Sequence, residues 1–244
     1  MGNWLEREEL LLGKEAVSAL QKANLLAVGL GGVGGLAVEM IVRGGVGSIT
    51  IVDGDIVEES NRNRQIIALT STVGRNKADV LAERLLAINP DLKLTIRTDF
   101  LKDEDMEDLV QSGSFDCVLD AIDTLAPKIS LIKSAIKRGI PVVSSMGSGA
   151  HIDPEKIACV PVTKTYNCPL SKAVRKGLRG IPAEELKLCR AVFTSEDPVE
   201  NAVIDTHSLA NNKRAMQGTV SYMPALFGCH CAAEVIRILR GGTI

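Results

Sequence analysis

The sequence predicts an α/β protein with a doubly wound, mostly parallel sheet, followed by a C-terminal extension of mixed strands and helices. Short apolar runs alternate with segments of helical periodicity. A glycine-rich turn directly follows the first run, at Gly29, Gly31 and Gly34. The 244 residues and 45% hydrophobic content suffice for one core. We expect one domain over 1–244, with a Rossmann-like core at about 5–150 and an extension at about 151–244.

The first 150 residues predict strands alternating with helices. Expected strands are 25–28, 48–52, 92–97, 115–119 and 140–144, and expected helices are 14–22, 34–42, 74–88, 106–110 and 127–137. The helix over 74–88 has apolar residues at helical spacing and stops at Asn89-Pro90. Strands separated by helices favour a parallel sheet with helices on both faces.

The alternation breaks in the extension. Expected strands are 157–162 and 191–194, and expected helices are 168–178 and 182–188. Residues 196–216 are polar and irregular, as in a loop near a site. Residues 219–239 are apolar but contain Pro224, Glu234 and Arg237, which predicts a buried helix and not a membrane span.

Composition narrows the function classes. The formal net charge of −2 gives no global basic field. None of the six cysteines forms a C-x-x-C pair, so we expect neither zinc nor a disulfide scaffold. The N-terminus is acidic where a signal peptide would be basic. These features favour a cytoplasmic protein with reduced thiols and no membrane segment.

The glycine turn fits the pattern G-x-G-x-x-G, and Asp53 follows Gly34 by about twenty residues. Such a turn brings backbone N–H groups close to phosphates at a helix N-terminus. The pattern alone leaves three interpretations open. They are an NAD-dependent oxidoreductase, a site for another nucleotide, and a tight turn without a ligand.

Charged residues after later strands favour a triphosphate over NAD. Arg64 and Lys77 could neutralise phosphate oxygens, and Asp123 could hold Mg²⁺. Each residue taken alone could be a surface charge or a helix cap. Together they follow successive strand ends, where open α/β sheets bind ligands.

The order of G-L-G-G-V-G (29–34), V-D-G-D (52–55), N-R-N-R-Q (61–65), Lys77 and D-A-I-D (120–123) resembles the adenylating domain of the ubiquitin-activating, ThiF-like superfamily. The resemblance implies an ATP site with Mg²⁺ at Asp123 and a homodimer in which Arg7 reaches the ATP of the second subunit. The catalytic residues that it implies are Arg64, Lys77, Asp123 and Arg7. The implied ATP-binding set is Gly29, Gly31, Gly32, Gly34, Asp53, Asp55, Asn61, Arg64, Gln65, Lys77, Asp120 and Asp123.

Within that superfamily, the chain resembles the tRNA threonylcarbamoyladenosine dehydratases. The matching stretches include "NRNRQIIALTSTVGRNKADVLAERLLAINP", "DAIDTLAPKISLI", "GSGAHIDPEKI" and "VFTSE". The resemblance implies ATP-dependent cyclisation of threonylcarbamoyladenosine beside the tRNA anticodon, through activation of the threonyl carboxylate. A zinc-free adenylyltransferase of a ubiquitin-like sulfur-carrier protein remains the alternative, and a non-catalytic nucleotide-binding scaffold is a third interpretation.

One position departs from the dehydratases. They place a cysteine directly before "VF", where this chain has Ala191, and Cys189 lies two residues earlier. A two-residue offset keeps the same face of a strand. Cys189 could therefore replace the missing thiol, or it could be an inert core residue. The departure weakens the expectation of a sulfur-transfer partner protein.

Basic residues in the extension are candidates for tRNA binding. Lys172, Arg175, Lys176 and Arg179 have the spacing of one helical face. Such a face could contact phosphates or could simply be solvated. Lys164 and His207 are further candidates for tRNA contact.

Overall fold

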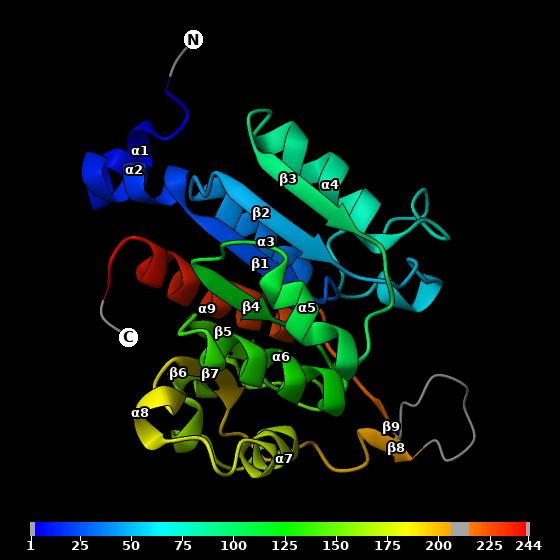
Figure 1. Cartoon of the computed structure of the whole chain (residues 1–244). Coiled ribbons are helices and arrows are strands. Elements are labelled where there is room, and N and C mark those ends of the chain that lie inside the picture. Colours follow the sequence, from blue (N-terminus) through cyan, green and yellow to red (C-terminus); the bar gives the residue numbers. More distant parts are fainter. Residues whose placement is uncertain (1–2, 206–214, 243–244) are drawn as a thin grey trace.

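The computed structural model describes residues 3–205 and 215–242, and Figure 1 shows the chain. Within these residues seven strands form one sheet in the order β3-β2-β1-β4-β5-β7-β6. All neighbours pair in parallel except β6 and β7. The predicted doubly wound, mostly parallel sheet is therefore confirmed. The strands are β1 Asn24–Val28, β2 Ser48–Val52, β3 Lys93–Arg97, β4 Cys117–Asp120, β5 Val142–Ser145, β6 Ile157–Pro161 and β7 Cys189–Thr194.

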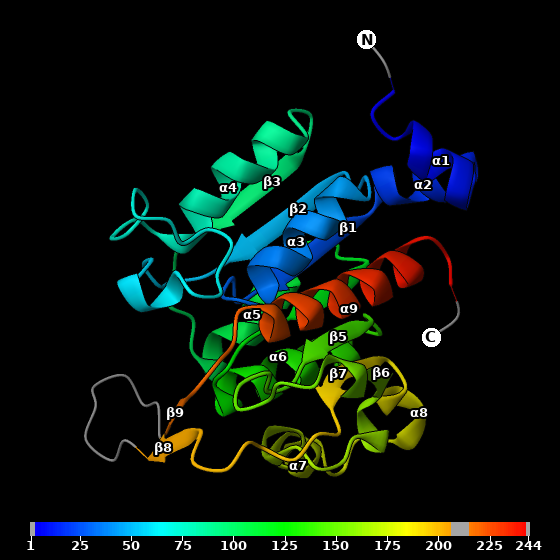
Figure 2. The ribbon, with the colours of Figure 1, turned by 180° about the vertical axis from the view of Figure 1, so that it is seen from behind.

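Helices cover both faces of the sheet, as Figures 1 and 2 show from opposite sides. One face carries α3, α4 and α9, whose apolar residues join one core cluster. The other face carries α5, α6 and α7 over a second cluster. The helices are α1 Glu6–Leu12, α2 Lys14–Lys22, α3 Gly34–Arg43, α4 Lys77–Ile88, α5 Met106–Gln111, α6 Leu125–Lys137, α7 Pro169–Gly177, α8 Ala183–Leu186 and α9 Tyr222–Leu239.

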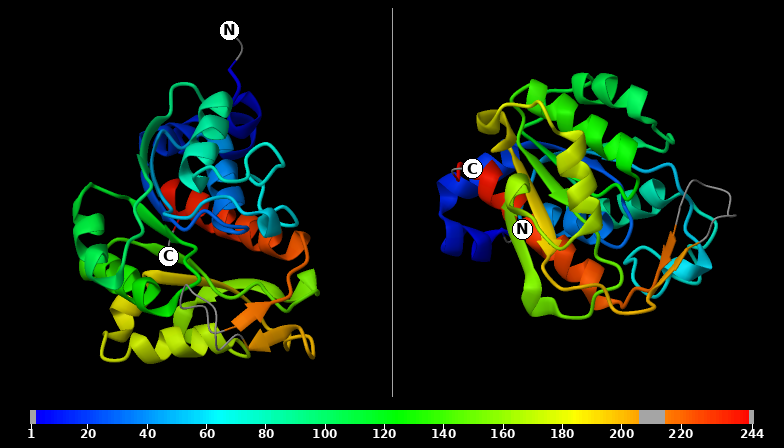
Figure 3. Two further views of the ribbon diagram at one scale, coloured as in Figure 1. Left: turned by 90° about the vertical axis from the view of Figure 1, so that its right-hand side faces the viewer. Right: turned by 90° about the horizontal axis from the view of Figure 1, so that it is seen from below.

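The extension is built onto the same sheet. Its strands β7 and β6 continue the sheet beyond β5, and α9 packs along α3. The two views of Figure 3 show α9 lying across the sheet. Across the described residues, no helix combines the length and the apolarity that crossing a membrane requires.

Apart from small shifts at the ends of other elements, the structure differs from the expected elements in three places. Helix α1 was not expected. Helix α4 begins at Lys77 and not at residue 74, because the Gly74 N–H donates to the Val57 carbonyl and Asn76 forms a β-bridge with Ile56. The polar stretch expected as a loop contains two short paired strands, β8 Val203–Asp205 and β9 Ala215–Gln217.

Candidate nucleotide and substrate site

The strand order reverses between β1 and β4, and this is where open α/β sheets bind their ligands. The glycine turn follows the carboxyl end of β1, and the turn that carries Asp123 follows β4. The two turns touch, because a Cβ on Gly29 would lie 2.7 Å from the carbonyl oxygen of Ala121. The topology thus brings the G-L-G-G-V-G and D-A-I-D motifs together.

Glycine is required at both ends of the turn. Gly29 has a φ of +87°, which a side chain strains. A Cβ on Gly34 would lie 1.8 Å from the Gly29 carbonyl oxygen. The contact means that α3 can begin directly against the strand only if residue 34 has no side chain. The N-terminus of α3 therefore sits where a phosphate could approach it.

Asp53 braces the turn. Its Oδ2 accepts from the Leu30 N–H at 2.6 Å, and its Oδ1 accepts from the Asp55 N–H at 2.9 Å. Burial raises the pKa of this carboxyl, and the charge of Lys77 opposes the rise. Both oxygens keep a second lone pair, so Asp53 can still accept from a ligand hydroxyl.

Lys77 is held at the start of α4 by an ion pair. Its Nζ lies 2.8 Å from Asp55 Oδ2, with 8% of the lysine side chain and 49% of the aspartate side chain exposed. The ammonium is thus fixed in place before any ligand binds. A fixed, partly desolvated cation is suited to charge that develops on phosphate oxygens.

Residues 61–65 lie against the glycine turn. The Arg64 carbonyl would lie 3.4 Å from a Cβ on Gly32, and Gln65 Nε2 would lie 3.6 Å from one on Gly31. The Arg64 guanidinium donates to the Ser60 carbonyl at 2.9 Å. The Oε1 atom of Gln65 is buried and has no hydrogen-bond partner among the described residues.

Asn61 has a structural contact in this loop. It is buried, and its Oδ1 accepts from the Glu58 N–H at 3.1 Å, which closes a short 3-10 turn. The side chain therefore shapes the loop that presents Arg64.

The Asp120 carboxylate is paired with other side chains of the protein. The sequence predicted it as a nucleotide ligand, but its carboxylate is fully buried. Lys128 Nζ lies 2.8 Å from Oδ2, and the Ser144 hydroxyl donates to the same oxygen at 2.6 Å. We therefore leave Asp120 out of the proposed nucleotide contacts.

Lys128 was missed by the sequence analysis. Its ammonium also donates to the Ile122 carbonyl at 2.9 Å, and so fixes the turn that ends at Asp123. Asp123 itself is exposed after β4, on the same edge of the sheet as the glycine turn. No sequence pattern marks Lys128, because its role depends on a burial that only the tertiary fold creates.

Arg7 lies far from the glycine turn of its own chain. It is exposed on α1, which precedes α2 and hence the amino end of β1. The glycine turn follows the carboxyl end of the same strand. Figure 1 shows α1 at the edge of the sheet opposite the strand tips. Trp4, Leu10 and Leu11, beside Arg7, are 51%, 82% and 80% exposed.

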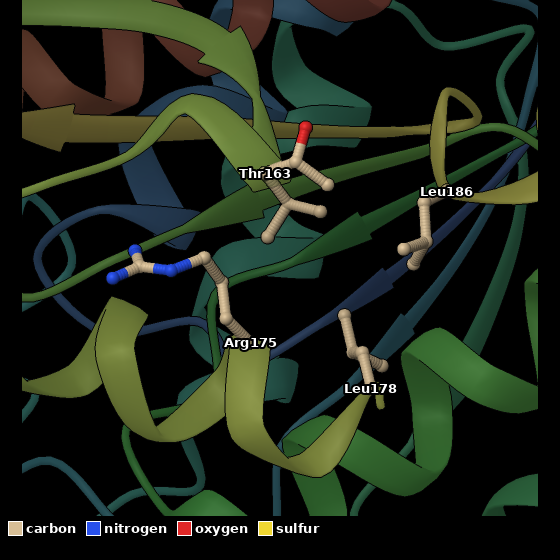
Figure 4. Close-up of a pocket in the computed structure, with 5 residues that line it drawn as sticks. Thr163, Arg175, Leu178 and Leu186 are labelled. Carbon is tan, nitrogen blue, oxygen red and sulfur yellow. The ribbon is translucent and has the colours of Figure 1, made fainter. Parts of the chain in front are cut away.

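The basic residues predicted to bind tRNA differ in their exposure to solvent. Lys164, Lys172, Lys176 and Arg179 are exposed, and Arg179 lies beyond the end of α7. Arg175 is half-buried and donates to the hydroxyls of Thr165 and Ser171. It lines a pocket of about 260 Å³ with Thr163, Leu178 and Leu186, which Figure 4 shows. The four-cation face is therefore corrected to three exposed cations, because the loop before α7 draws Arg175 inward.

Cys189 is a core residue. It is fully buried on β7, and burial raises the pKa of its thiol to about 12. Ala191 is buried on the same strand. A thiol with this pKa carries almost no thiolate at neutral pH, so it is poorly suited to sulfur transfer. His207 lies outside the described residues.

The sequence and the fold are both similar to those of known proteins. The ThiF family model matches residues 5–243. A tRNA threonylcarbamoyladenosine dehydratase of Bacillus subtilis is 40% identical over 195 residues, which cover 79% of this chain and 75% of that protein.

Two solved structures of the E. coli tRNA N6-threonylcarbamoyladenosine dehydratase TcdA, one with ATP and one with AMP, each superpose with a TM-score of 0.85 at 31% identity. Each comparison covers 96% of this chain and 92% of the other. The predicted resemblance is confirmed, and the chain belongs to the ThiF family.

Proposed function

We propose that this protein uses ATP to cyclise threonylcarbamoyladenosine beside the anticodon of tRNA. The observation that carries the proposal is the glycine turn braced by Asp53 with Lys77 fixed beside it, in a chain that matches the ATP-bound TcdA fold over 96% of its length. A cytoplasmic location is part of the same proposal, since the substrate is tRNA.

The glycine turn and its neighbours make up the proposed nucleotide contacts. Backbone N–H groups at the start of α3 face the phosphates, while Asp53 accepts from the ribose. Arg64 and Lys77 neutralise phosphate charge. Gln65 and Asp55 are the remaining side chains that line the proposed nucleotide site. Lys77 would exchange its partner Asp55 for a phosphate oxygen when ATP binds.

The proposed chemistry makes a poor leaving group into a good one. A carboxylate oxygen of the threonyl group attacks the α-phosphorus of ATP, forming a mixed anhydride and releasing pyrophosphate. The neighbouring carbamoyl group then attacks the activated carbonyl carbon, closes the ring and releases AMP. The net change in the nucleoside is the loss of one water. Orientation and charge neutralisation suffice, so no enzyme nucleophile is required.

We also propose that Mg²⁺ binds together with ATP, with Asp123 as its protein ligand. Among the described residues, no three His, Cys, Asp or Glu side chains form a metal-binding cluster. Mg²⁺ in nucleotide sites uses one or two carboxylates together with substrate phosphates, and Asp123 can supply one. The ion would neutralise phosphate charge.

A homodimer with Arg7 acting across the interface is also proposed. The position of Arg7 at the opposite edge of its own sheet and the exposed Trp4, Leu10 and Leu11 around it support this arrangement. Mixing Arg7→Ala with Asp123→Ala subunits should restore about one quarter of wild-type activity, because half of the dimers are mixed and each has one intact site. No recovery despite demonstrated subunit exchange would contradict the arrangement.

The exposed cations Lys164, Lys172, Lys176 and Arg179 are the proposed phosphate contacts of tRNA. A sulfur-transfer partner receives no support from the buried Cys189.

The experiment that tests the proposal measures conversion of the open nucleoside to the cyclic one in tRNA. Purified protein, ATP and MgCl₂ are incubated with tRNA that carries the open nucleoside, and the digested nucleosides are weighed by mass spectrometry. The proposal expects the open form to disappear with the loss of one water, and only when ATP is present. Unchanged tRNA, together with ATP–pyrophosphate exchange that depends on a ubiquitin-like protein, would transfer the assignment to the adenylyltransferase alternative.

A further inference from the structure

His151 lies in a second pocket at the carboxyl edge of the sheet. It follows β5 by six residues and lines a cavity of about 350 Å³. Only 5% of the residue is exposed, and neither ring nitrogen has a hydrogen-bond partner among the described residues. An unpaired buried polar group costs about 1–3 kcal/mol, so its retention calls for a functional explanation.

The pocket wall is held by backbone hydrogen bonds. The Ala150 N–H donates to the Gly218 carbonyl at 2.8 Å, and the Val199 N–H donates to the Ala150 carbonyl at 2.7 Å. Ala150 has a φ of +62°, a conformation that is strained for alanine and is found preferentially at functional sites. These hydrogen bonds join the three segments that contain Ala150, Val199 and Gly218, all of which line the pocket.

The segment after His151 is held by hydrogen bonds to two side chains, Glu196 and Tyr222. The buried Glu196 carboxylate accepts the N–H groups of Ile152 and Asp153 at 2.9 to 3.1 Å. The Tyr222 hydroxyl donates to the Ile152 carbonyl at 2.8 Å. The segment that carries His151 is therefore positioned before any ligand binds, which lowers the entropic cost of recognition.

The pocket adjoins the nucleotide site. Thr219 lines it, and the Thr219 carbonyl accepts from the Asn63 amide at 3.0 Å, in the same loop as Arg64. Pro224 lies just beyond, where its Cβ would be 3.0 Å from a Cβ on Gly32. A substrate that presents its carboxylate to ATP could thus place a neighbouring group in this pocket.

The lining determines what kind of group fits. Among the described residues, the lining has no Asp, Glu, Lys or Arg side chain, since the members are Ala150, His151, Ile152, Val199, Ala202, Gly218, Thr219 and Val220. Apolar walls disfavour a phosphate, whereas the two imidazole nitrogens can hydrogen-bond to a polar ligand. A volume of about 350 Å³ is at the small end of ligand sites. These properties match the flat face and polar edge of one nucleobase, and unstacked bases are how loops of RNA are recognised.

We propose that this pocket binds a single unstacked nucleobase of the anticodon loop and that His151 hydrogen-bonds to the edge of that base. The inference rests on the proposed function, because it takes the substrate to be tRNA. His151 is a positioning residue here, with no role in the activation of the carboxylate. It adds a base-specific contact to the phosphate contacts that the exposed cations provide.

The test asks whether a change at His151 and the loss of one RNA base affect the same contact. The variants are His151→Leu and Val199→Trp, which fills the pocket, with His230→Leu on α9 as the control histidine. Anticodon stem-loops that carry the open nucleoside are made with one abasic site at each of the other loop positions in turn. Conversion rates, KM for the RNA and Kd for ATP are measured, and thermal melting is followed.

Wild-type protein should show a rise in KM of about tenfold at one abasic position, as expected for the loss of a hydrogen-bonded base. His151→Leu and Val199→Trp should raise KM for intact RNA by about as much and should be insensitive to that abasic site. The Kd for ATP should stay unchanged. The melting temperature of His151→Leu should not fall, because the substitution removes unpaired polar atoms.

Additive effects of the variant and the abasic site, or a KM within twofold of wild type in both variants, would overturn the inference. Failure of the wild-type protein to convert any RNA would instead refute the proposed function. A fall in the melting temperature of His151→Leu with an unchanged KM would assign the imidazole to packing alone and would also overturn the proposal.

Discussion

The nucleotide region and the extension hold most of their polar groups in different ways. In the nucleotide region, Asp53 and Asp120 accept hydrogen bonds from neighbouring protein groups, and Lys128 is buried against Asp120, although Gln65 Oε1 has no partner among the described residues. In the extension, His151 is buried without a partner among the described residues, and three cations around the end of α7 face solvent. The first region is built for a small ligand of fixed shape. The second retains unpaired groups that a macromolecular substrate can engage.

The contrast predicts that the largest effects come from the nucleotide region. Gly34→Ala places a methyl group 1.8 Å from the Gly29 carbonyl oxygen. The backbone must move, so we expect the free energy of unfolding to fall by more than about 4 kcal/mol. Gly139→Ala is the matched control, because Gly139 has a φ of +70° but open space around its Cβ position. Chemical denaturation should show a loss of only about 1–2 kcal/mol for the control.

Lys77→Ala should leave the fold intact and remove activity. The substitution leaves phosphate charge uncompensated where a fixed donor stood, which costs about 10²–10³ in kcat. Lys137→Ala, on a side chain that is 73% exposed, should behave as wild type. Single-turnover conversion of tRNA measures both variants. A rate for Lys77→Ala within threefold of wild type would refute the role assigned to this lysine.

The extension can be weakened from within through Glu234. This buried residue on α9 pairs with Arg190 of β7 and with Arg237, each at 2.7 Å. Glu234→Gln should lower the free energy of unfolding by about 2 kcal/mol at neutral pH, less than for a fully buried pair because both arginines are partly exposed.

The effect should depend on pH in a defined direction. Hydrogen bonds from Arg237 lower the pKa of Glu234 below its ordinary value of 4.5. The stabilisation is therefore present above pH 4.5 and is lost as the pH falls through the lowered value. Melting curves of Glu234→Gln and wild type should converge in that acid range. Glu107→Gln, which breaks an exposed pair with Lys137, should leave the melting curve unchanged at neutral pH.

The smallest effect is expected on the basic surface. Replacing Lys172, Lys176 and Arg179 with alanine should flatten the log–log salt dependence of tRNA affinity by up to about one unit per lost contact. Lys14 and Lys22 on α2 are the control cations. Filter binding at several salt concentrations distinguishes them. An unchanged slope would make these three residues a solvated surface without a nucleic-acid contact.

The sequence predicted the features that depend on local geometry. The glycine turn, the position of Asp53 and the alternation of strands with helices along the chain follow from spacing and periodicity, and the structure contains them. The start of α4 was misplaced because the Ile56–Asn76 bridge and the bond from Gly74 to Val57 join segments about twenty residues apart.

The features that depend on burial were not predictable. Asp120 and Lys128 form an ion pair only because the fold excludes water around them. Arg175 shares its helical spacing with exposed cations, and only its neighbours Thr165 and Ser171 show that it turns inward. His151 carries no spacing signal, and its interest arises from unpaired nitrogens in a buried pocket.

The central claim is that ATP activates the threonyl carboxylate. Transfer RNA carrying ¹⁸O in that carboxylate is converted by the protein, and the AMP produced is weighed by mass spectrometry. Attack of the carboxylate on the α-phosphorus moves one labelled oxygen into AMP during ring closure, so AMP should gain one ¹⁸O for each ring closed. Cyclisation with unlabelled AMP, and with the label released as water or phosphate, would contradict the account.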